Sequence, residues 1–295
     1  MQAGHTPVLV GEVLRWLEVR PDGVYIDTTV GLGGHAREIA KRLTTGRLIG
    51  LDRDAAALEI ARERLKEFGE RVTLVNANFG RLDEVAKEMQ LPPADGVLAD
   101  LGVSSMQLDQ VERGFSFRGA GPLDMRMGDD AELTAEDIVN GWRENELADV
   151  LYQLGEEHDS RRIARAIVRS RPIRSTQHLA TVVAGARSRG RQRLHPATKT
   201  FLALRIAVNR ELEALGQFLS RTPATLNSNG RCVVLSYHSL EDRMVKRAFQ
   251  AEARAGVLRI LTKKAVQPSA SEIDMNPRAR SAKLRAAQRI GPVAA

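Results

Sequence analysis

Glycines 31, 33 and 34 stand between two acidic residues at a spacing that suits nucleotide chemistry. Residues 24–35 read V-Y-I-D-T-T-V-G-L-G-G-H, so an apolar run ends at Asp27 just before the glycines. Glycine adopts positive φ and lets a ligand approach the backbone without a Cβ in the way. Asp52 follows Gly31 by 21 positions, close to the spacing at which nucleotide-binding folds place a carboxylate on ribose hydroxyls. We expect a nucleoside-type cofactor here rather than an ordinary strand–helix turn with an acidic helix cap.

The charge beside the turn indicates which cofactor this is. The dinucleotide pattern G-x-G-x-x-G is matched only with alanine in its last place, at Ala36, which is weak support either way. A carboxylate at Asp27 would repel a pyrophosphate but would attract a ligand that carries an ammonium or sulfonium group. S-adenosylmethionine is such a ligand, and the sequence favours it.

Four apolar runs with helical segments between them are placed to position these residues. The runs cover residues 24–26, 47–51, 71–75 and 95–99, and they lead into Asp27, Asp52, Phe79 and Asp100 respectively. Strands that alternate with helices predict an α/β fold, a doubly wound parallel sheet with helices on both faces. Ligands of such sheets lie at the carboxyl ends of the strands. We therefore expect these four side chains to surround one cofactor site.

Positive charge is concentrated in one segment. The chain has a formal net charge of +7, yet residues 161–210 alone contain thirteen Lys and Arg and no Asp or Glu. The remaining residues carry 31 basic and 37 acidic side chains. A solvated helical face usually mixes both signs, so the segment favours a surface that faces nucleic acid.

Other features bound the class of protein. The single cysteine, Cys232, leaves no internal disulfide and fits a reducing cytoplasm. No apolar run of membrane-spanning length and no signal peptide is visible, so no membrane partner is expected. The six histidines are scattered, and we predict no metal site.

The second half of the chain predicts an inserted helical domain. Residues 110–127 have poor periodicity and read as an ordered functional loop. Thr134 begins a capping-box pattern, and helical signals then continue to about residue 190. We predict a core of residues 1–126 and 195–295, with a helical substrate-recognition domain at 127–194.

Smaller elements follow from local signals. Thr6-Pro7 predicts the start of the first helix, and Asp54 predicts the cap of a later one that runs to about residue 68. An apolar stripe from Phe201 to Leu219 predicts one long helix beginning at His195. The sheet should resume at residues 231–235, with last strands at 256–261 and 283–290.

Several long motifs resemble those of a known family. H-T-P-V-L, D-T-T-V-G-L-G-G-H, D-L-G-V-S-S-M-Q-L-D, P-L-D-M-R-M and S-Y-H-S-L-E-D-R are similar to the bacterial MraW (RsmH) family of 16S rRNA (cytosine-N4)-methyltransferases, over nearly the whole chain. The resemblance implies a class I, Rossmann-like methyltransferase sheet with a helical insertion. It also implies methylation of a decoding-region cytidine, with S-adenosyl-L-methionine as cofactor and 16S rRNA, expected within the small ribosomal subunit, as partner. A monomer and a homodimer both remain open.

The resemblance also implies site residues. Contacts to the cofactor are expected from Gly33, Gly34, His35, Asp52, Phe79, Asp100 and Gln107. Asp52 would accept both ribose hydroxyls, Phe79 would pack on the adenine, and Asp100 would stand near the methionine end. For Phe79 alone, a core aromatic at a helix start is an equal interpretation.

Methyl transfer to an amino nitrogen requires alignment of donor and acceptor more than a strong base. Asp100 is the first candidate for a polar contact to the target amine. Further candidates for holding the base or its phosphates are Ser104, Ser105, Asp124, Arg126, His238 and Asp242, and Arg165 and Arg169 in the basic segment. Attack at cytosine C5 would need a thiolate, and Cys232 lies in an apolar run, so C5 methylation is disfavoured.

Two other classes of protein stay open at this point. One is a nicotinamide-dependent oxidoreductase, against which Asp27 and the incomplete dinucleotide pattern argue. The other is a non-catalytic RNA-binding assembly factor that kept the fold.

Overall fold

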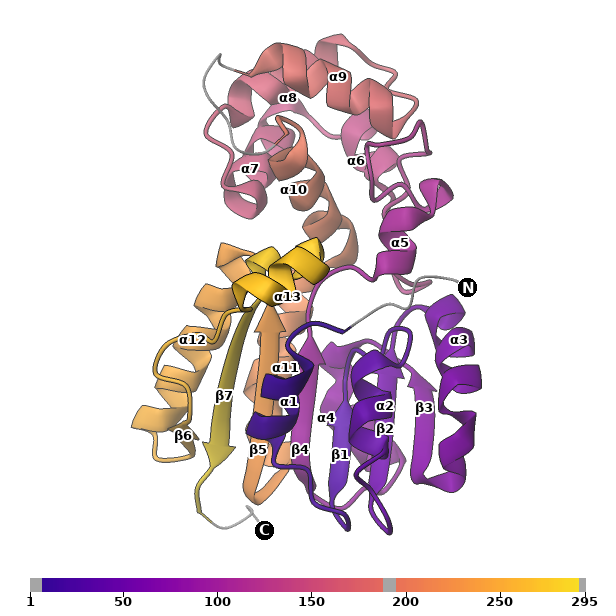
Figure 1. Ribbon diagram of the computed structural model, residues 1–295. Coiled ribbons are helices and arrows are strands. Elements are labelled where there is room, and N and C mark those ends of the chain that lie inside the picture. Colours follow the sequence, from indigo (N-terminus) through magenta and orange to yellow (C-terminus); the bar gives the residue numbers. More distant parts are fainter. Residues whose placement is uncertain (1–6, 188–194, 292–295) are drawn as a thin grey trace. The chain divides into compact units, whose positions relative to one another are not determined.

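The chain forms two compact units in the computed structural model, which describes residues 7–187 and 195–291 (Figure 1). Unit 1 comprises residues 1–102 and 212–295, and unit 2 comprises residues 103–211. No helix in the described part of the chain is long and apolar enough to cross a membrane.

Unit 1 is built on a seven-stranded sheet with the order β3-β2-β1-β4-β5-β7-β6. The strands are β1 (Val24–Asp27), β2 (Arg47–Asp52), β3 (Val72–Asn76), β4 (Ala94–Asp100), β5 (Leu226–Ser236), β6 (Leu258–Ile260) and β7 (Lys283–Arg289). The first five pair in parallel, as predicted. The sheet is not wholly parallel, however, because β7 runs antiparallel to both β5 and β6. Apolar periodicity marks a strand but carries no information on its direction.

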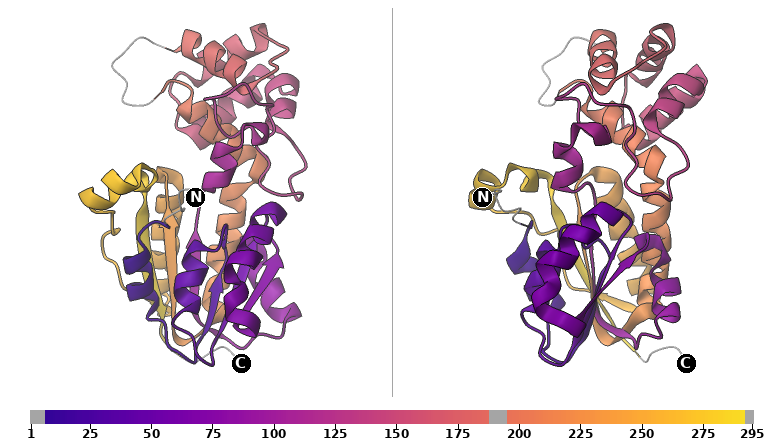
Figure 2. Two further views of the ribbon diagram at one scale, coloured as in Figure 1. Left: turned by 45° about the vertical axis from the view of Figure 1, so that its right-hand side comes forward. Right: turned by 90° about the vertical axis from the view of Figure 1, so that its right-hand side faces the viewer.

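Helices cover both faces of this sheet (Figure 2). On one face lie α1 (Val10–Leu17), α2 (Gly34–Ala40) and α3 (Ala55–Leu65), and on the other lie α4 (Leu82–Glu88), α11 (Glu211–Thr225) and α12 (Ser239–Arg254). The remaining short elements are α13 (Ala270–Met275) and 3₁₀ turns at Lys66–Arg71, Phe79–Arg81 and Pro277–Ser281. With both faces covered, β1 and β4 are buried along most of their length. The predicted doubly wound α/β fold is confirmed.

Helix ends depart slightly from the prediction. Asp54 caps α3 as expected, since its side chain accepts hydrogen bonds from the backbone N–H groups of Ala56 and Ala57. That helix ends at Leu65, however, and a 3₁₀ turn follows it. The first helix begins at Val10, after Leu9 in a left-handed conformation, and not at Thr6-Pro7. Thr6 itself lies outside the described residues.

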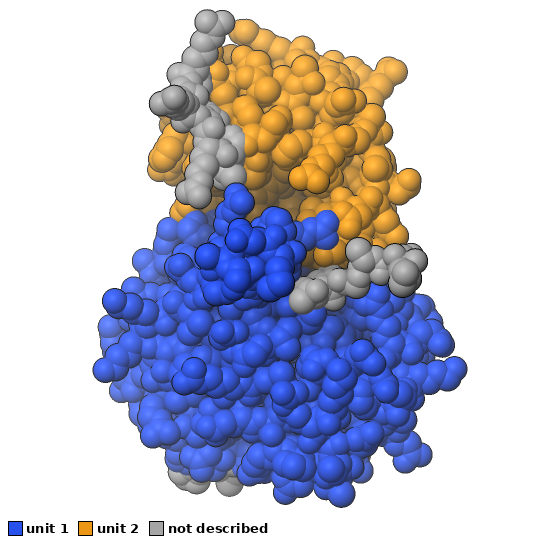
Figure 3. Space-filling view, viewed as in Figure 1, with its two compact units in different colours: residues 1–102, 212–295 blue, residues 103–211 orange. Residues whose placement is uncertain are grey.

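Unit 2, the orange part of Figure 3, is helical. It contains α5 (Ser105–Asp109), a 3₁₀ turn at Val111–Arg113, α6 (Ala135–Gly141), α7 (Glu144–Gly155), α8 (Ser160–Arg169), α9 (Thr176–Ala186) and α10 (Thr198–Asn209). The predicted capping box at Thr134 is present, with Asp137 as its partner.

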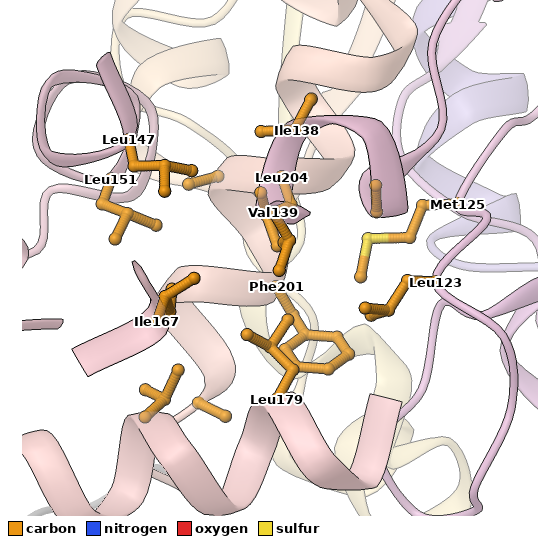
Figure 4. Packing of buried hydrophobic residues seen from close by; sticks show 14 of the residues in the cluster. Leu123, Met125, Ile138, Val139, Leu147, Leu151, Ile167, Leu179, Phe201 and Leu204 are labelled. Atoms are coloured by element: carbon orange, nitrogen blue, oxygen red, sulfur yellow. The ribbon is translucent and has the colours of Figure 1, made fainter. Parts of the chain in front are cut away.

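The boundaries of this unit are wider than the predicted 127–194. Leu123 and Met125 before that range, and Phe201 and Leu204 after it, belong to the same buried core as the helices between them (Figure 4). Helical periodicity alone ended the prediction at 127, because the residues before it are apolar but not periodic. Packing against one core, and not local secondary structure, sets the limits of a compact unit.

A buried asparagine orders the irregular residues 110–127. Asn209 of α10 donates a hydrogen bond to the Met125 carbonyl (2.7 Å) and accepts one from the Met127 N–H (2.8 Å). Buried backbone groups outside regular structure need such partners. The segment is therefore an ordered part of unit 2.

The predicted long helix from His195 is two helices. Between α10 and α11, Arg210 has φ 50° and breaks the helical path. The apolar stripe continues because both helices bury one face, and a one-residue break does not interrupt three- and four-residue spacing. The prediction of a buried apolar stripe was therefore correct, and the prediction of one continuous helix was wrong.

Candidate functional site

The sheet has a topological switch point between β1 and β4. From β1 the chain moves outward through β2 to β3, and β4 then returns to the other side of β1. Ligands of such sheets bind at the carboxyl ends of the strands at this point. β1 ends at Asp27 and β4 ends at Asp100, so both acids lie at this point.

The glycine turn follows β1 directly. Gly31 has φ 51° and Gly33 has φ 83°, and Gly33 is the N-cap of α2. A Cβ on Gly34 would lie only 3.0 Å from the Pro7 ring. The glycines therefore set a backbone path that other residues adopt with strain. This path places the first turn of α2 at the carboxyl edge of the sheet.

The Asp52 side chain is hydrogen-bonded to the glycine turn. Its Oδ2 accepts a hydrogen bond from the Gly31 N–H (2.7 Å), and its Oδ1 accepts one from the Asp54 N–H (2.9 Å). Burial raises the pKa of Asp52 to about 6, against the lowering effect of these two hydrogen bonds. The structure thus places Asp52 in contact with the glycine turn, as the spacing of Gly31 and Asp52 in the sequence predicted.

Asp27 is buried more deeply than expected. Its side chain is 1% exposed, and Oδ1 accepts a hydrogen bond from the Thr29 N–H (3.2 Å). No hydrogen-bond donor for Oδ2 is found among the described residues. Burial raises the pKa of this carboxyl group to about 7. Asp27 is therefore a buried group at the end of β1, and its charge depends on pH near neutrality.

His35 stands between the two acids of the switch point. It lies in the first turn of α2, is 6% exposed, and places Nε2 3.4 Å from Asp100 Oδ2. Burial lowers the pKa of His35, but the Asp100 and Asp27 carboxylates outweigh this effect and hold the pKa above its usual value. Asp27, His35 and Asp100 form a coupled acid–base–acid group.

Asp100 is held from several sides. Its backbone N–H donates to Thr29 Oγ1 (2.6 Å), and its Oδ1 accepts a hydrogen bond from the Tyr237 hydroxyl (2.7 Å). The side chain is about one quarter exposed. A fixed, partly exposed carboxylate at a strand end can accept a hydrogen bond from a ligand.

Phe79 lies beyond the end of β3, in a short 3₁₀ turn capped by Asn78. The ring is half-buried and packs edge-to-face on Phe218, with ring centroids 5.8 Å apart. The core interpretation of Phe79 therefore holds for one side of the ring. Contact with an adenine stays a prediction.

The S-Y-H-S-L-E-D-R motif forms the turn between β5 and α12. Buried Glu241 accepts hydrogen bonds from the N–H groups of Tyr237 (2.8 Å) and His238 (3.3 Å). His238 Nε2 lies 3.1 Å from Glu241 Oε1. These contacts show that Glu241 organises the turn. A role of His238 in holding the substrate stays a prediction.

Asp242, the next residue of the motif, is already paired. Its carboxylate accepts hydrogen bonds from Arg285 (2.7 Å) and Lys283 (3.3 Å) of β7. Burial would raise the pKa of Asp242, but the two cations outweigh it and lower the pKa. The observed contacts tie α12 to β7, which is a structural role.

Three further candidates lie in and before α5 of unit 2. Ser104 caps this helix and Ser105 is its first residue. Gln107 is 5% exposed, and its Oε1 accepts a hydrogen bond from the Ser104 N–H (3.0 Å). The D-L-G-V-S-S-M-Q motif thus continues from the end of β4 into a capping box.

Asp124 and Arg126 form a two-pronged ion pair at 2.8 and 2.9 Å. Burial would raise the pKa of Asp124, but the Arg126 hydrogen bonds outweigh it and lower the pKa. Both side chains of the pair remain partly exposed. They keep the P-L-D-M-R-M loop in one conformation.

A groove with arginines along one side lies between α8 and α9. Its lining includes Arg162, Arg165 and Arg169 of α8, and Thr181 and Gly185 of α9. A Cβ on Gly185 would meet no atom within 4 Å, so the groove is open there. Arg165 also faces Glu144 at 3.4 Å. The structure brings Arg165 and Arg169 together on one helix face, as their spacing predicts.

Cys232 is fully buried in β5, and burial raises the pKa of its thiol far above the usual range. A thiolate nucleophile is therefore not available at this position. The sequence-based argument against C5 chemistry gains a physical reason.

Two residues of the site were missed in the sequence. Tyr237 holds Asp100, and Thr29 accepts the hydrogen bond from its backbone. Tyr237 adjoins His238 in a motif that was noticed, but pairing β4 with β5 is a long-range event that local spacing does not reveal.

The comparisons with known sequences agree on one family. The sequence profile of the MraW methylase family matches residues 2–290. A ribosomal RNA small subunit methyltransferase H from Koribacter versatilis is 53% identical over 299 residues, covering 98% of this chain and 95% of that protein. The protein of the same name from Cyanothece sp. is 51% identical over 286 residues, covering 97% and 95%. A solved rRNA methylase from Streptococcus thermophilus aligns with a TM-score of 0.45 and 14% identity, covering 98% of this chain and 100% of that one.

Proposed function

The chain belongs to the MraW methylase family, and we propose that it methylates the exocyclic N4 of a decoding-region cytidine in 16S ribosomal RNA, with S-adenosylmethionine as methyl donor. Membership in a methylase family decides against the nicotinamide-dependent oxidoreductase. Buried Cys232 argues against methylation at C5.

The observation that carries this proposal is the set of acids at the switch point. Asp52 offers a carboxylate beside the glycine turn, where a ribose would lie. Asp27 leaves a buried oxygen without a described donor, and Asp100 is partly exposed at the next strand end. This set of carboxylates fits a nucleoside that carries positive charge, because carboxylates attract a cation and accept hydroxyl hydrogen bonds.

In this proposal the chain's own groups align the reaction. Bound S-adenosylmethionine would supply an activated methyl group on a sulfonium leaving group. Gly33, Gly34 and His35 would form the floor of its site, with Asp52 at the ribose and Phe79 beside the adenine. Asp100 would lie at the methionine end, where its carboxylate could also accept one N–H of the target amine. Alignment and exclusion of water, more than proton abstraction, would provide the rate.

Unit 2 would bind the RNA. Arg165 and Arg169 face a groove whose described lining contains no acidic side chain. Arginine on one helix face suits backbone phosphates, which are contacted in a sequence-independent way. Ser104, Ser105, Gln107, Asp124 and Arg126 lie in the first segments of this unit, and His238 and Asp242 in the turn after β5 and the helix that follows. We propose that the five residues of unit 2, together with His238, contact the base, the cofactor or nearby phosphates. Asp242 would support the turn between β5 and α12.

Nucleoside mass spectrometry of methylated RNA tests the proposal. Small subunits and naked 16S RNA from a strain that lacks this gene would be incubated with the protein and S-adenosylmethionine. We expect N4-methylcytidine to appear at one decoding-region cytidine with at least one of the two substrates. A Cys232→Ala variant should retain the activity. Methylation at C5, or binding of RNA without any methylation, would contradict the proposal.

A further inference from the structure

Groups from three parts of unit 1 meet at Asp100. It is approached by Tyr237 from the β5–α12 turn, by His35 from α2, and through its backbone by Thr29 from the loop after β1. Only Tyr237, among the described residues, donates a short hydrogen bond to the carboxylate itself, at 2.7 Å. His35 Nε2 is more distant, at 3.4 Å from the other oxygen.

Tyr237 is itself held in place. Its N–H donates to buried Glu241 at 2.8 Å. A Cβ on Gly102, which has φ 104°, would lie 3.3 Å from the Tyr237 ring, so this glycine leaves room for the ring. Burial and the Asp100 carboxylate raise the pKa of Tyr237 well above its ordinary value. The hydroxyl therefore remains a proton donor at any pH at which the protein works.

These contacts explain the S-Y-H-S-L-E-D-R motif, to which sequence reasoning gave only candidate substrate contacts. Glu241 fixes the backbone of Tyr237 and His238, and Tyr237 reaches across to the end of β4. The motif thus links α12 to the acid at the switch point. A helix cap alone would not require a phenol that donates to Asp100.

We propose that Tyr237 is a positioning residue, which holds the Asp100 carboxylate in one orientation, directed toward the methyl donor. This inference rests on the proposed function, since it assumes that Asp100 contacts the donor. It adds a role for a residue outside the predicted site. Tyr237 would act through Asp100 and would not contact the reacting atoms.

Several charged groups surround the hydrogen-bonded pair of Asp100 and Tyr237. Asp27 of β1, His35 of α2, Glu241 of α12 and Glu272 of α13 all lie within electrostatic reach of the Asp100–Tyr237 pair. Removing the Tyr237 hydroxyl should leave Oδ1 of Asp100 without its 2.7 Å donor and its carboxylate freer to rotate among these groups.

The test is a Tyr237→Phe variant, with Tyr25→Phe as matched control. Tyr25 is a buried tyrosine of unit 1 whose hydroxyl is likewise hydrogen-bonded, since it accepts from the Arg20 N–H at 2.7 Å. Titration calorimetry with S-adenosylmethionine, without RNA, should give an affinity about tenfold weaker for Tyr237→Phe, as expected for a lost hydrogen bond to a charged group. Tyr25→Phe should lower thermal stability and leave donor affinity unchanged.

Carbon-13 NMR of the Asp100 carboxyl in the ligand-free protein provides a second readout. We expect its chemical shift at neutral pH to change in Tyr237→Phe, which loses the hydrogen bond to Oδ1, and to stay unchanged in Tyr25→Phe. An unchanged chemical shift together with unchanged donor affinity would overturn the inference, as would equal effects in both variants. A wild-type protein that binds no donor would instead overturn the proposed function, and the carboxyl chemical shift would still decide whether Tyr237 holds Asp100.

Discussion

Asp27 and Asp52 end neighbouring strands, but their carboxyl groups have different surroundings. Asp52 has a backbone hydrogen bond on each oxygen, whereas Asp27 has one on Oδ1 and no described donor on Oδ2. The first is equipped to stay ionised and receive a ligand. The second is charged only above about pH 7, and His35 is the group that most favours its charged form in the described structure.

Replacing Asp52 should weaken donor binding and leave RNA binding intact. Asp52→Ala removes the proposed ribose acceptor, and a charged hydrogen-bond partner of this kind changes affinity by about ten- to hundredfold. Titration calorimetry would measure this, with RNA affinity as the control. Equal losses of both affinities would contradict the separation of donor and RNA sites.

Donor affinity should also depend on pH through Asp52. Because the pKa of Asp52 lies at about 6 in the free protein, its carboxyl group is increasingly protonated below that pH. The donor affinity of the wild type should therefore decrease as the pH falls below about 6. A wild-type curve that matches the Asp52→Ala curve in this range would argue against a role for the Asp52 charge.

Asp27 should reduce stability at neutral and alkaline pH. Its folded pKa, about 7, lies above the ordinary value of 3.8, so the folded state binds the proton more tightly than the unfolded state. The cost is absent below the lower value, grows between the two values and is complete above the higher one. Asp27→Asn should thus raise the free energy of unfolding at pH 8 by at most about 4 kcal/mol, with little change near pH 4. Urea denaturation at both pH values measures this, and a loss of stability at pH 8 would contradict it.

Single residues were predictable where local spacing decides their position. Gly31 and Asp52 are brought together by one strand–helix–strand unit, and the spacing indicated their contact. The burial of Asp27 was not visible, because it depends on how α2 and β4 cover the end of β1. Tyr237 was missed for a similar reason, since its contact with Asp100 spans 137 positions.

At the scale of elements, the sequence predicted types better than ends and directions. Apolar runs located β1, β2, β3 and β4, and capping patterns located α3 and α6. The antiparallel direction of β7 and the break at Arg210 were not predictable in this way. Both depend on tertiary packing, which adds nothing to the local period of apolar residues.

The α8–α9 groove allows a test by a side chain that adds charge without a clash. A Cβ added to Gly185 would meet no described atom within 4 Å, and Gly185 lies in a helix, where residues with side chains are favoured over glycine. Gly185→Glu should place a carboxylate among Arg162, Arg165 and Arg169, whereas Gly185→Gln has nearly the same shape without the charge. We expect RNA affinity to fall about three- to tenfold for Glu relative to Gln, with the salt slope reduced by about one.

Filter binding at several salt concentrations measures both quantities. Circular dichroism and donor affinity should be the same for the two Gly185 variants. If Glu and Gln bind RNA equally well, with equal salt slopes, the groove is not an RNA surface. If both variants bind RNA less tightly than the wild type and to the same extent, the size of the added side chain, and not its charge, is what weakens RNA binding.

The net positive charge of the chain is not concentrated in either unit as a whole. Unit 2, residues 103–211, contains 17 basic and 15 acidic residues, and unit 1 contains the other 27 basic and 22 acidic residues. Within unit 2, residues 161–210 carry thirteen of the basic residues and none of the acidic ones. The positive charge is thus a property of the segment from α8 to α10, balanced within the unit by the fifteen acidic residues that lie outside residues 161–210.

The separation of the two binding roles is testable by combining variants. The proposed donor residues 33, 34, 35, 52, 79 and 100 lie in unit 1, and one further donor residue, Gln107, lies in unit 2. The arginines of the groove also lie in unit 2, which has a hydrophobic core of its own, and they belong to α8 and not to α5. Effects at sites that share no partners add within about 0.5 kcal/mol. Arg169→Glu should weaken RNA binding and flatten its salt dependence, and Asp52→Ala should weaken donor binding. The double variant should lose as much donor affinity as Asp52→Ala and as much RNA affinity as Arg169→Glu. Calorimetry measures the first and filter binding measures the second. A larger loss of either affinity in the double variant would mean that donor and RNA binding are coupled, and the independence of the two units in binding would be refuted.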